Sequence, residues 1–261
     1  MSGIQLMKQY EAVILTLERL GGAATLGTLY QEVFKIKECE WKTKTPFASI
    51  RRIVQENSEI YKVKPGLWAL EKYRKRLEAD GIMEETAYNA NSQAIAAFNH
   101  TYYQALLVQI GNMKQLRTYV HSQDKNKLFL NKTPLSNLCT LNEIPQYSYK
   151  KLVHRSDTID VIWFKPHAID PANVLMPHAF FEVEHSTNFQ NSLLKYGDLT
   201  DFNSRMVIVA DQKRKAEFEN KMSFSSLTDL KEKKRVEFLS YDKLVDIYEL
   251  TMRQHRQSLF I

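Results

Sequence analysis

The sequence predicts an α/β protein of the α+β type, with a small N-terminal domain and a larger C-terminal domain built on a mixed sheet flanked by helices. Three observations lead to this prediction. Helix-spaced apolar residues dominate the first part of the chain, acid-bearing β-like runs lie in its middle, and the basic excess is confined to the first third. We expect domains at 1–77 and 92–261, joined by a linker at 78–91.

Composition excludes several protein classes. The 261 residues are 44% hydrophobic and 25% charged, which is typical of a globular chain. Two cysteines, Cys39 and Cys139, exclude a disulfide framework and a Cys-rich zinc site. No apolar run approaches the roughly 18 residues of a membrane span, and no secretory pattern opens the chain. We therefore expect a cytoplasmic protein with no membrane partner.

The charge is unevenly distributed. Residues 1–77 contain 14 Lys and Arg against 8 Asp and Glu, whereas residues 78–261 contain 22 of each. The whole excess of six positive charges therefore lies in the first domain. A small basic domain joined to a neutral one predicts contact with a polyanion, although a solvated lysine-rich surface is an equal alternative.

The N-terminal domain shows three helical segments and then a hairpin. Apolar residues recur at helical spacing over 4–20, and a second helix starts after Thr25, a good N-cap. Thr45-Pro46 is typical of an N-cap and first helical position. Two short β-like runs, 60–63 and 67–70, flank a Pro-Gly turn. This order predicts a winged helix.

Over about residues 3–72 the chain resembles the HARE-type helix-turn-helix domain, through the runs LGTLYQEVF, TPFASIRRIVQEN and IYKVKPGLWAL. The resemblance implies DNA recognition, including the sensing of modified bases, with the third helix in the major groove. The candidate DNA contacts on this helix and the wing are Lys44, Ser49, Arg51, Arg52, Lys62 and Lys64. A winged helix that binds another protein is the alternative.

Three carboxylates stand out in the C-terminal domain, after one long helix or two broken ones expected over 92–120. A β-branched and aromatic run at 158–164 carries Asp160. A second run, 179–186, alternates apolar side chains with Glu182 and Glu184, so a strand places both glutamates on one face. About 20 residues separate Asp160 from Glu182, which fits adjacent antiparallel strands with their acids side by side.

Such a cluster is costly without a counter-charge. At an effective dielectric of about 20, two unit charges ~4 Å apart repel by ~4 kcal/mol. The acids must therefore protonate, pair with a basic side chain or hold a cation. A hard divalent ion with oxygen ligands, above all Mg²⁺, fits best. Beside a DNA-binding domain, a carboxylate-held Mg²⁺ predicts phosphodiester hydrolysis.

Here the chain resembles the PD-(D/E)xK nucleases, the restriction-endonuclease-like fold, over about residues 92–250. Asp160 matches the first acid of the motif and Glu182 the second, which implies that both hold the metal. Glu184 stands where the family usually has lysine, so its role is open: metal ligand, water-orienting base or neither. The flanking runs FEVEHSTNFQNSLLKYGDLTDF and RMVIVADQKRK resemble the helix and strand that follow the catalytic strand.

A lysine, several histidines and one more aspartate are further candidates for the site. Lys195, on the next helix, either replaces the missing lysine or faces solvent. Strand alternation points His185 to the opposite face, as a structural histidine, and Asp157 is a weaker alternative to Asp160. The remaining histidines considered, which show no metal-binding spacing, are His100, His121, His154, His167 and His178. No nucleotide-binding fingerprint is present, so we expect no nucleotide cofactor.

These predictions combine into a Mg²⁺-dependent endonuclease of restriction or defence type. It would cut double-stranded DNA, plain or modified, with Asp160 and Glu182 as metal ligands and Glu184 and Lys195 as further catalytic candidates. Cutting both strands needs two active sites, so we expect a homodimer. The alternative is a non-catalytic DNA-binding regulator whose nuclease-like domain dimerises or senses a ligand. A nuclease acting on RNA or on particular nucleic-acid structures is a third reading.

Overall fold

The computed structural model describes residues 6–90 and 92–258. Packing divides the chain into two compact units: unit 1 is Met1–Ile95 with Val245–Ile261, and unit 2 is Ala96–Leu244. Most of the C-terminal helix therefore belongs to unit 1. The domain expected at 92–261 had placed this helix in the C-terminal domain. Among the described residues, no helix has the length and apolarity to cross a membrane.

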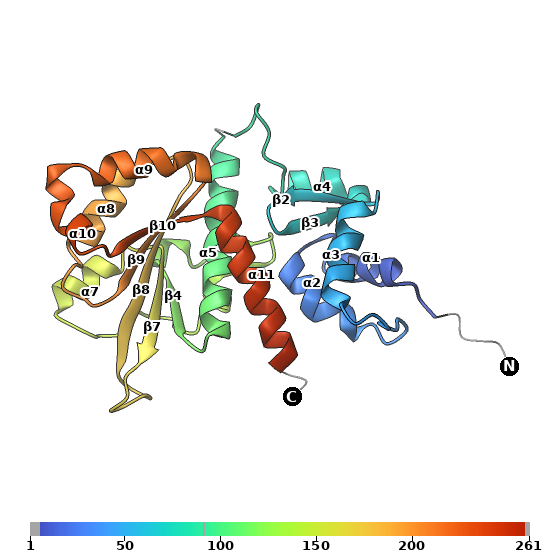
Figure 1. The fold of residues 1–261 in the computed structure, drawn as a ribbon, viewed down its shortest axis with the longest axis horizontal. Coiled ribbons are helices and arrows are strands. Elements are labelled where there is room, and N and C mark those ends of the chain that lie inside the picture. The colour runs from blue at the N-terminus through green and yellow to red at the C-terminus, as the bar shows by residue number, and fades with distance from the viewer. Residues whose placement is uncertain (1–5, 91, 259–261) are drawn as a thin grey trace. The chain divides into compact units, whose positions relative to one another are not determined.

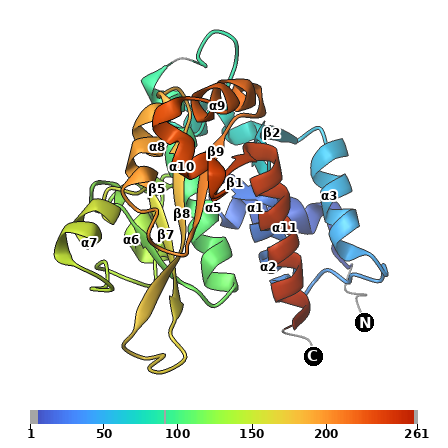
Figure 2. The ribbon, with the colours of Figure 1, turned by 60° about the vertical axis from the view of Figure 1, so that its left-hand side comes forward.

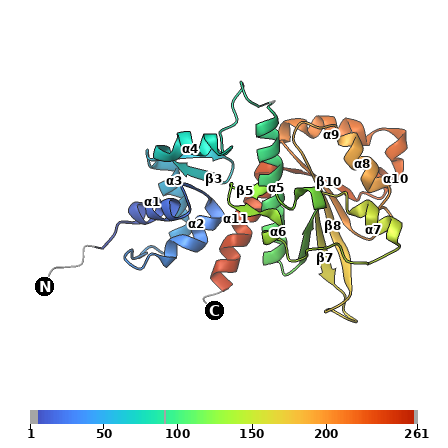
Figure 3. The same cartoon turned by 180° about the vertical axis from the view of Figure 1, so that it is seen from behind.

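Unit 1 has the predicted element order of a winged helix (Figures 1 and 3). Its helices and strands before the linker are α1 (Gln9–Arg19), β1 (Ala23–Thr25), α2 (Leu26–Glu32), α3 (Pro46–Glu56), β2 (Ile60–Lys64), β3 (Leu67–Leu70) and α4 (Arg74–Ala79). The three strands form an antiparallel sheet in the order β1-β3-β2. Strand β1 was not predicted, because three residues are too few to show a period.

The predicted starts of α2 and α3 are confirmed. The Thr28 N–H donates to Thr25 Oγ1 at 3.0 Å at the start of α2. Thr45 and Pro46 occupy the predicted positions at the start of α3, but the Thr45 side chain makes no cap hydrogen bond. The first helix begins at Gln9, and Ile4, where we expected it to begin, lies outside the described residues. Ile50 and Val54 are buried on α3, which leaves the opposite side of this helix toward solvent.

Unit 2 is a five-stranded mixed sheet between two layers of helices. Its elements, with α5 beginning and α11 ending outside its limits, are α5 (Gln93–Met113), β4 (Arg117–Val120), β5 (Leu128–Phe129), β6 (Thr133–Pro134), α6 (Leu135–Leu138), α7 (Lys150–Ser156), β7 (Val161–Pro166), β8 (Leu175–Glu184), α8 (Phe189–Gly197), β9 (Arg205–Ala210), α9 (Lys215–Met222), α10 (Thr228–Glu232), β10 (Val236–Ser240) and α11 (Tyr241–Ser258). The large sheet has the order β10-β9-β8-β7-β4.

The sheet changes from antiparallel to parallel at β8, and the antiparallel pairing of its two acidic strands confirms the prediction. Strands β4, β7 and β8 pair antiparallel, and β8, β9 and β10 pair parallel. Helix α5 covers one face, and α8, α9 and α10 cover the other (Figures 1 and 2). Trp163 of β7 donates from Nε1 to the Leu107 carbonyl of α5 at 3.0 Å, which anchors the α5 layer.

The helix expected over 92–120 ends earlier, which corrects that prediction. Gln115 adopts a left-handed conformation with φ 59°, and the Leu116 N–H closes the helix on the Gly111 carbonyl at 3.0 Å. Residues 117–120 then form β4, antiparallel to β7. Sequence periodicity missed the break because the apolar residues continue through it.

Helix α11 packs tightly on α2 within unit 1. Tyr248 Oη lies 3.0 Å from Thr25 Oγ1, and Gln31 Nε2 donates to the Met252 carbonyl at 2.7 Å. At Gly27 of α2, a Cβ atom would lie 2.6 Å from Tyr248 Cε1 and 2.8 Å from Met252 Cγ. Only glycine permits this approach without a shift of α11.

We therefore expect Gly27→Ala to destabilise the protein by about 1 kcal/mol. The overpacking cost of about 1–3 kcal/mol exceeds the gain of about 1 kcal/mol from helix propensity. Thermal unfolding measures the difference. Gly197→Ala is the matched control, since a Cβ there meets nothing within 4 Å. Equal melting temperatures of the two variants would contradict the packing argument.

Candidate active site

The pairing of β7 with β8 brings the first two predicted acids together. Val161 pairs with Phe181, and continuing this antiparallel register by one residue sets Asp160 opposite Glu182. The His121 N–H donates to the Asp160 carbonyl at 3.1 Å, which extends the pairing of β4 with β7 by one residue beyond Val120 and Val161. Asp160 thus stands immediately before the first residue of β7, where its carboxylate contacts both β8 and α5.

Asp160 Oδ2 accepts two contacts. The Val183 N–H of β8 donates to it at 2.7 Å, and His100 Nε2 of α5 lies 3.1 Å away. The side chain is 13% exposed. Asp160 is therefore held by the sheet and by α5 at a partly open position.

Glu182 lies deeper, at 3% exposure, and contacts Lys195. Lys195 Nζ on α8 lies 3.0 Å from Oε1 and 2.9 Å from Oε2 of Glu182, and it also donates to the Thr158 carbonyl at 2.8 Å. Ser192 Oγ donates to Glu182 Oε2 at 2.9 Å. The amine of Lys195 therefore points into the acidic cluster, and of the two orientations expected from sequence the structure has the inward one.

Glu184 shares the face of Glu182, as strand alternation predicts. It is 6% exposed and accepts hydrogen bonds from the hydroxyls of Ser192 and Thr187. His185 projects to the other face, where its Nδ1 lies 3.0 Å from Asn99 Nδ2 of α5. The alternation expected over this strand is therefore present at both glutamates and at the histidine.

Burial raises the pKa of both glutamates of the site. Burial, then the charge of Asp160, raises the pKa of Glu182 to about 8, against the opposing effects of Lys195 and Ser192. Burial also raises the pKa of Glu184, with the Ser192 hydrogen bond opposing it. One lysine does not balance three carboxylates, and their oxygens are the hard donors that Mg²⁺ prefers. Asp160 and Glu182, with Glu184 beside them, are the donors available to such an ion.

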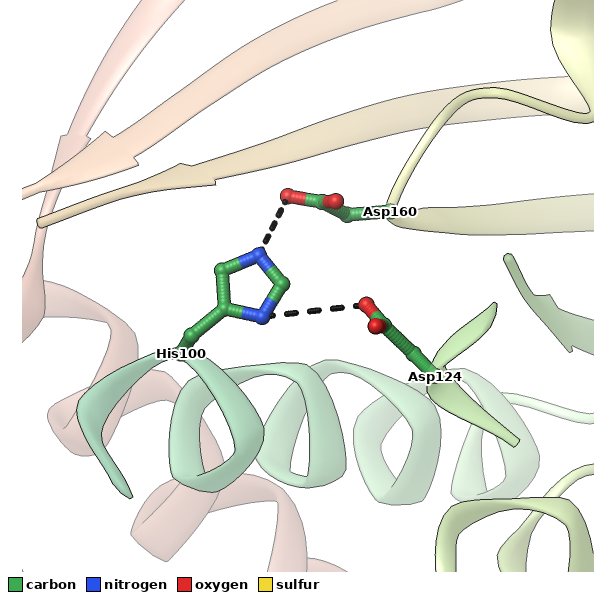
Figure 4. A group of neighbouring side chains, drawn as sticks. All are labelled: His100, Asp124 and Asp160. Carbon is green, nitrogen blue, oxygen red and sulfur yellow. Dashed lines mark hydrogen bonds and ion pairs between the residues drawn. The ribbon is translucent and has the colours of Figure 1, made fainter. Parts of the chain in front are cut away.

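A second polar group, which the sequence did not reveal, lies on the α5 side of Asp160 (Figure 4). His100 Nδ1 is 3.7 Å from Asp124 Oδ2, so the imidazole stands between two carboxylates. Gln104 Nε2 donates to Asp124 Oδ2 at 2.6 Å. The available signal was the pair of polar residues four apart, His100 and Gln104, on a largely buried helix. Asp124, in a short turn after β4, carries no such signal.

The candidate DNA contacts fall into two groups. The residues left accessible, fully or in part, are Lys44, Ser49, Arg51, Arg52 and Lys62. Arg51 is partly exposed but pairs with the buried carboxylate of Glu249 on α11, within unit 1. Lys64 is 7% exposed, and burial lowers its pKa to about 7. Its amine is therefore not presented at the surface of the wing.

Comparison with known proteins gives one match. The model of the family described as "Type II restriction enzyme NmeDI C-terminal domain" matches residues 83–259, which is more than half of the chain and includes every acid described above. No curated protein and no solved structure matches the chain.

The raised pKa of Glu182 predicts a pH-dependent cost to stability in the absence of divalent ions. Between the ordinary value of 4.5 and about 8, the folded protein binds a proton that the unfolded chain has released. Stability therefore falls as pH rises through this window and levels off above it. Glu182→Gln removes the ionisation of this side chain. In EDTA at pH 8–9 we therefore expect the variant to unfold at a higher temperature than the wild type, with a free energy of unfolding larger by about 1–3 kcal/mol.

The control is Glu219→Gln, whose exposed side chain makes only an i,i+4 pair with Lys215. It should follow the wild-type pH profile. If Glu182→Gln keeps the wild-type slope between pH 5 and pH 8, Glu182 is ionised throughout and the argument is wrong.

Proposed function

Because the chain belongs to the family of the type II restriction enzyme NmeDI C-terminal domain, we propose that it is a Mg²⁺-dependent DNA endonuclease with a PD-(D/E)xK-type site. Membership supports the coarser statement, a type II restriction-like nuclease. One observation carries the finer one: Asp160 stands opposite Glu182 at the end of two paired strands, with Lys195 on the same carboxylate. An acid pair and an amine in this arrangement suit phosphodiester hydrolysis.

The proposed roles follow from the contacts. Asp160 and Glu182 would hold the ion, which when bound lowers the pKa of a water and neutralises charge on the phosphate. The Val183 N–H fixes the position of the Asp160 carboxylate, which would act as a ligand. Glu182, protonated near neutral pH without an ion, would release its proton on binding.

Lys195 would take the place of the lysine absent from the strand. Its Nζ lies at hydrogen-bonding distance from both Glu182 oxygens, and its helix starts only a few residues after β8. A single positive charge there can stabilise the charge developing on the phosphate. Glu184 is fixed by two hydroxyl donors, Ser192 and Thr187, and in this proposal it orients the attacking water.

The winged helix would bring the duplex to the site. Arg52 is exposed on α3 and Lys62 on β2, and the basic excess of the chain lies in this part of the sequence. Phosphate contacts by such side chains fix position, whereas base identity or modification is read by other contacts. Cleavage of both strands calls for two copies of the site, so we propose a homodimer on DNA.

The catalytic proposal predicts that Asp160→Asn abolishes cleavage while DNA binding is kept. Removal of one metal-ligand charge should lower the cutting rate by at least about 100-fold. The assay incubates pure protein with methylated and unmethylated plasmid, in Mg²⁺ or in EDTA. Asp157→Asn is the matched control, since this nearby acid contacts Tyr119 Oη instead of the cluster.

Two outcomes would overturn the proposal. Cutting by Asp160→Asn at the wild-type rate removes Asp160 from the mechanism. Intact plasmid in every Mg²⁺ reaction, together with retarded DNA in a gel shift, leaves the non-catalytic regulator as the better description.

The DNA-binding proposal predicts a change in salt dependence. Each phosphate contact contributes about −0.9 to the slope of log affinity against log salt. Arg52→Ala and Lys62→Ala should each weaken binding and make the slope shallower by about 0.9. Lys233→Ala, in an i,i+4 pair with Asp229 on α10, should leave the slope unchanged. Slopes that do not differ among the three variants would exclude the winged helix as the phosphate-binding surface.

A further inference from the structure

His100 and Asp124 have no role in the mechanism above, and together with Asp160 they form a cluster. One potential ligand atom from each residue lies within 4.8 Å of the other two. Ligand bonds of about 2.0–2.2 Å place adjacent ligands of one ion roughly 3–4 Å apart, so the group would need to contract by on the order of 1 Å to hold an ion. The side chains come from α5, from the turn after β4 and from the end of β7 (Figure 4).

Two buried atoms at this cluster lack a hydrogen bond among the described residues. They are His100 Nδ1 and Gln104 Oε1. Gln104 is fully buried, and its amide is directed at the cluster because its Nε2 donates to Asp124 Oδ2. A buried polar atom without a hydrogen bond destabilises the folded protein. A cation bound by the imidazole and the carboxylates would supply Nδ1 with a partner and lies within reach of the Gln104 amide.

Both carboxylates of the cluster present an oxygen to the imidazole of His100. Lys127 Nζ binds the outer oxygen of Asp124, Oδ1, at 2.5 Å. The inner oxygen, Oδ2, faces His100 and Gln104. Asp160 Oδ2 faces the same imidazole. Two carboxylate oxygens thus converge on one histidine, with no lysine or arginine between them among the described residues.

We propose that His100, Asp124 and Asp160 form a second divalent-cation site, with Asp160 shared between it and the proposed Mg²⁺ site. A mixed imidazole and carboxylate set suits borderline transition ions such as Mn²⁺ or Co²⁺, whereas Mg²⁺ prefers oxygen alone. The two sites therefore differ in selectivity. The inference rests on the proposed function only through Asp160, because His100 and Asp124 belong to this second site alone.

The test counts bound ions on the full chain by equilibrium dialysis and by Mn²⁺ electron paramagnetic resonance, without DNA. We expect the wild type to bind two Mn²⁺ per chain, and His100→Ala and Asp124→Asn to bind one. Glu182→Gln should also bind one, with His100 retained as its ligand. Mg²⁺ binding should be unaffected by His100→Ala. Asp124→Asn preserves size and the Gln104 contact, so it serves where His100→Ala unfolds.

The control is His154→Ala on α7, a histidine outside the cluster, which should still bind two Mn²⁺. One Mn²⁺ per wild-type chain, unchanged by His100→Ala and by Asp124→Asn, would overturn the second site and leave His100 as an imidazolium between two carboxylates. Failure of the proposed nuclease is a separate result: two Mn²⁺ bound, with neither Mg²⁺ nor Mn²⁺ supporting DNA cleavage.

Discussion

The antiparallel pairing of β7 with β8 is the constraint on which the site depends. It sets Asp160 opposite Glu182 and, two residues along β8, adds Glu184 to the same face. Both glutamates are buried, at 3% and 6% exposure, so their mutual repulsion and their loss of hydration cannot be relieved by solvent. The fold therefore holds a concentration of acid that one lysine and two hydroxyls compensate only in part.

Helix α8 and helix α5, on opposite faces of the sheet, supply the polar side chains that contact the three acids. Helix α8 supplies Ser192 and Lys195, which contact the glutamates directly. Helix α5 supplies His100, which contacts Asp160. Asp160 is thus the common member of two polar groups, because it lies immediately before Val161, the first residue of β7, and is 13% exposed.

In unit 1 the folded chain uses part of the basic charge internally. Arg51 is neutralised by Glu249, a residue 198 positions later on α11. Lys64 is buried with a lowered pKa. The net charge of a segment therefore overstates the cations available to a polyanion. The accessible basic side chains are a smaller set, centred on α3 and the wing strand, and it is this set that a DNA-binding surface can use.

Sequence by itself determined the winged-helix order, the two acidic strands, the strand and helix after them, and the facing of Glu182, Glu184 and His185. These follow from backbone periods of 2.0 and 3.6 residues, which are local properties. The end of α5 was not predicted, because the apolar pattern continues past the residues at which the helix ends. Only the tertiary structure decided that Lys195 turns inward, that Asp124 and His100 meet Asp160, and that Arg51 is paired. Each of these contacts joins segments that are far apart in the sequence. Local periodicity does not describe such contacts, so they are fixed by packing alone.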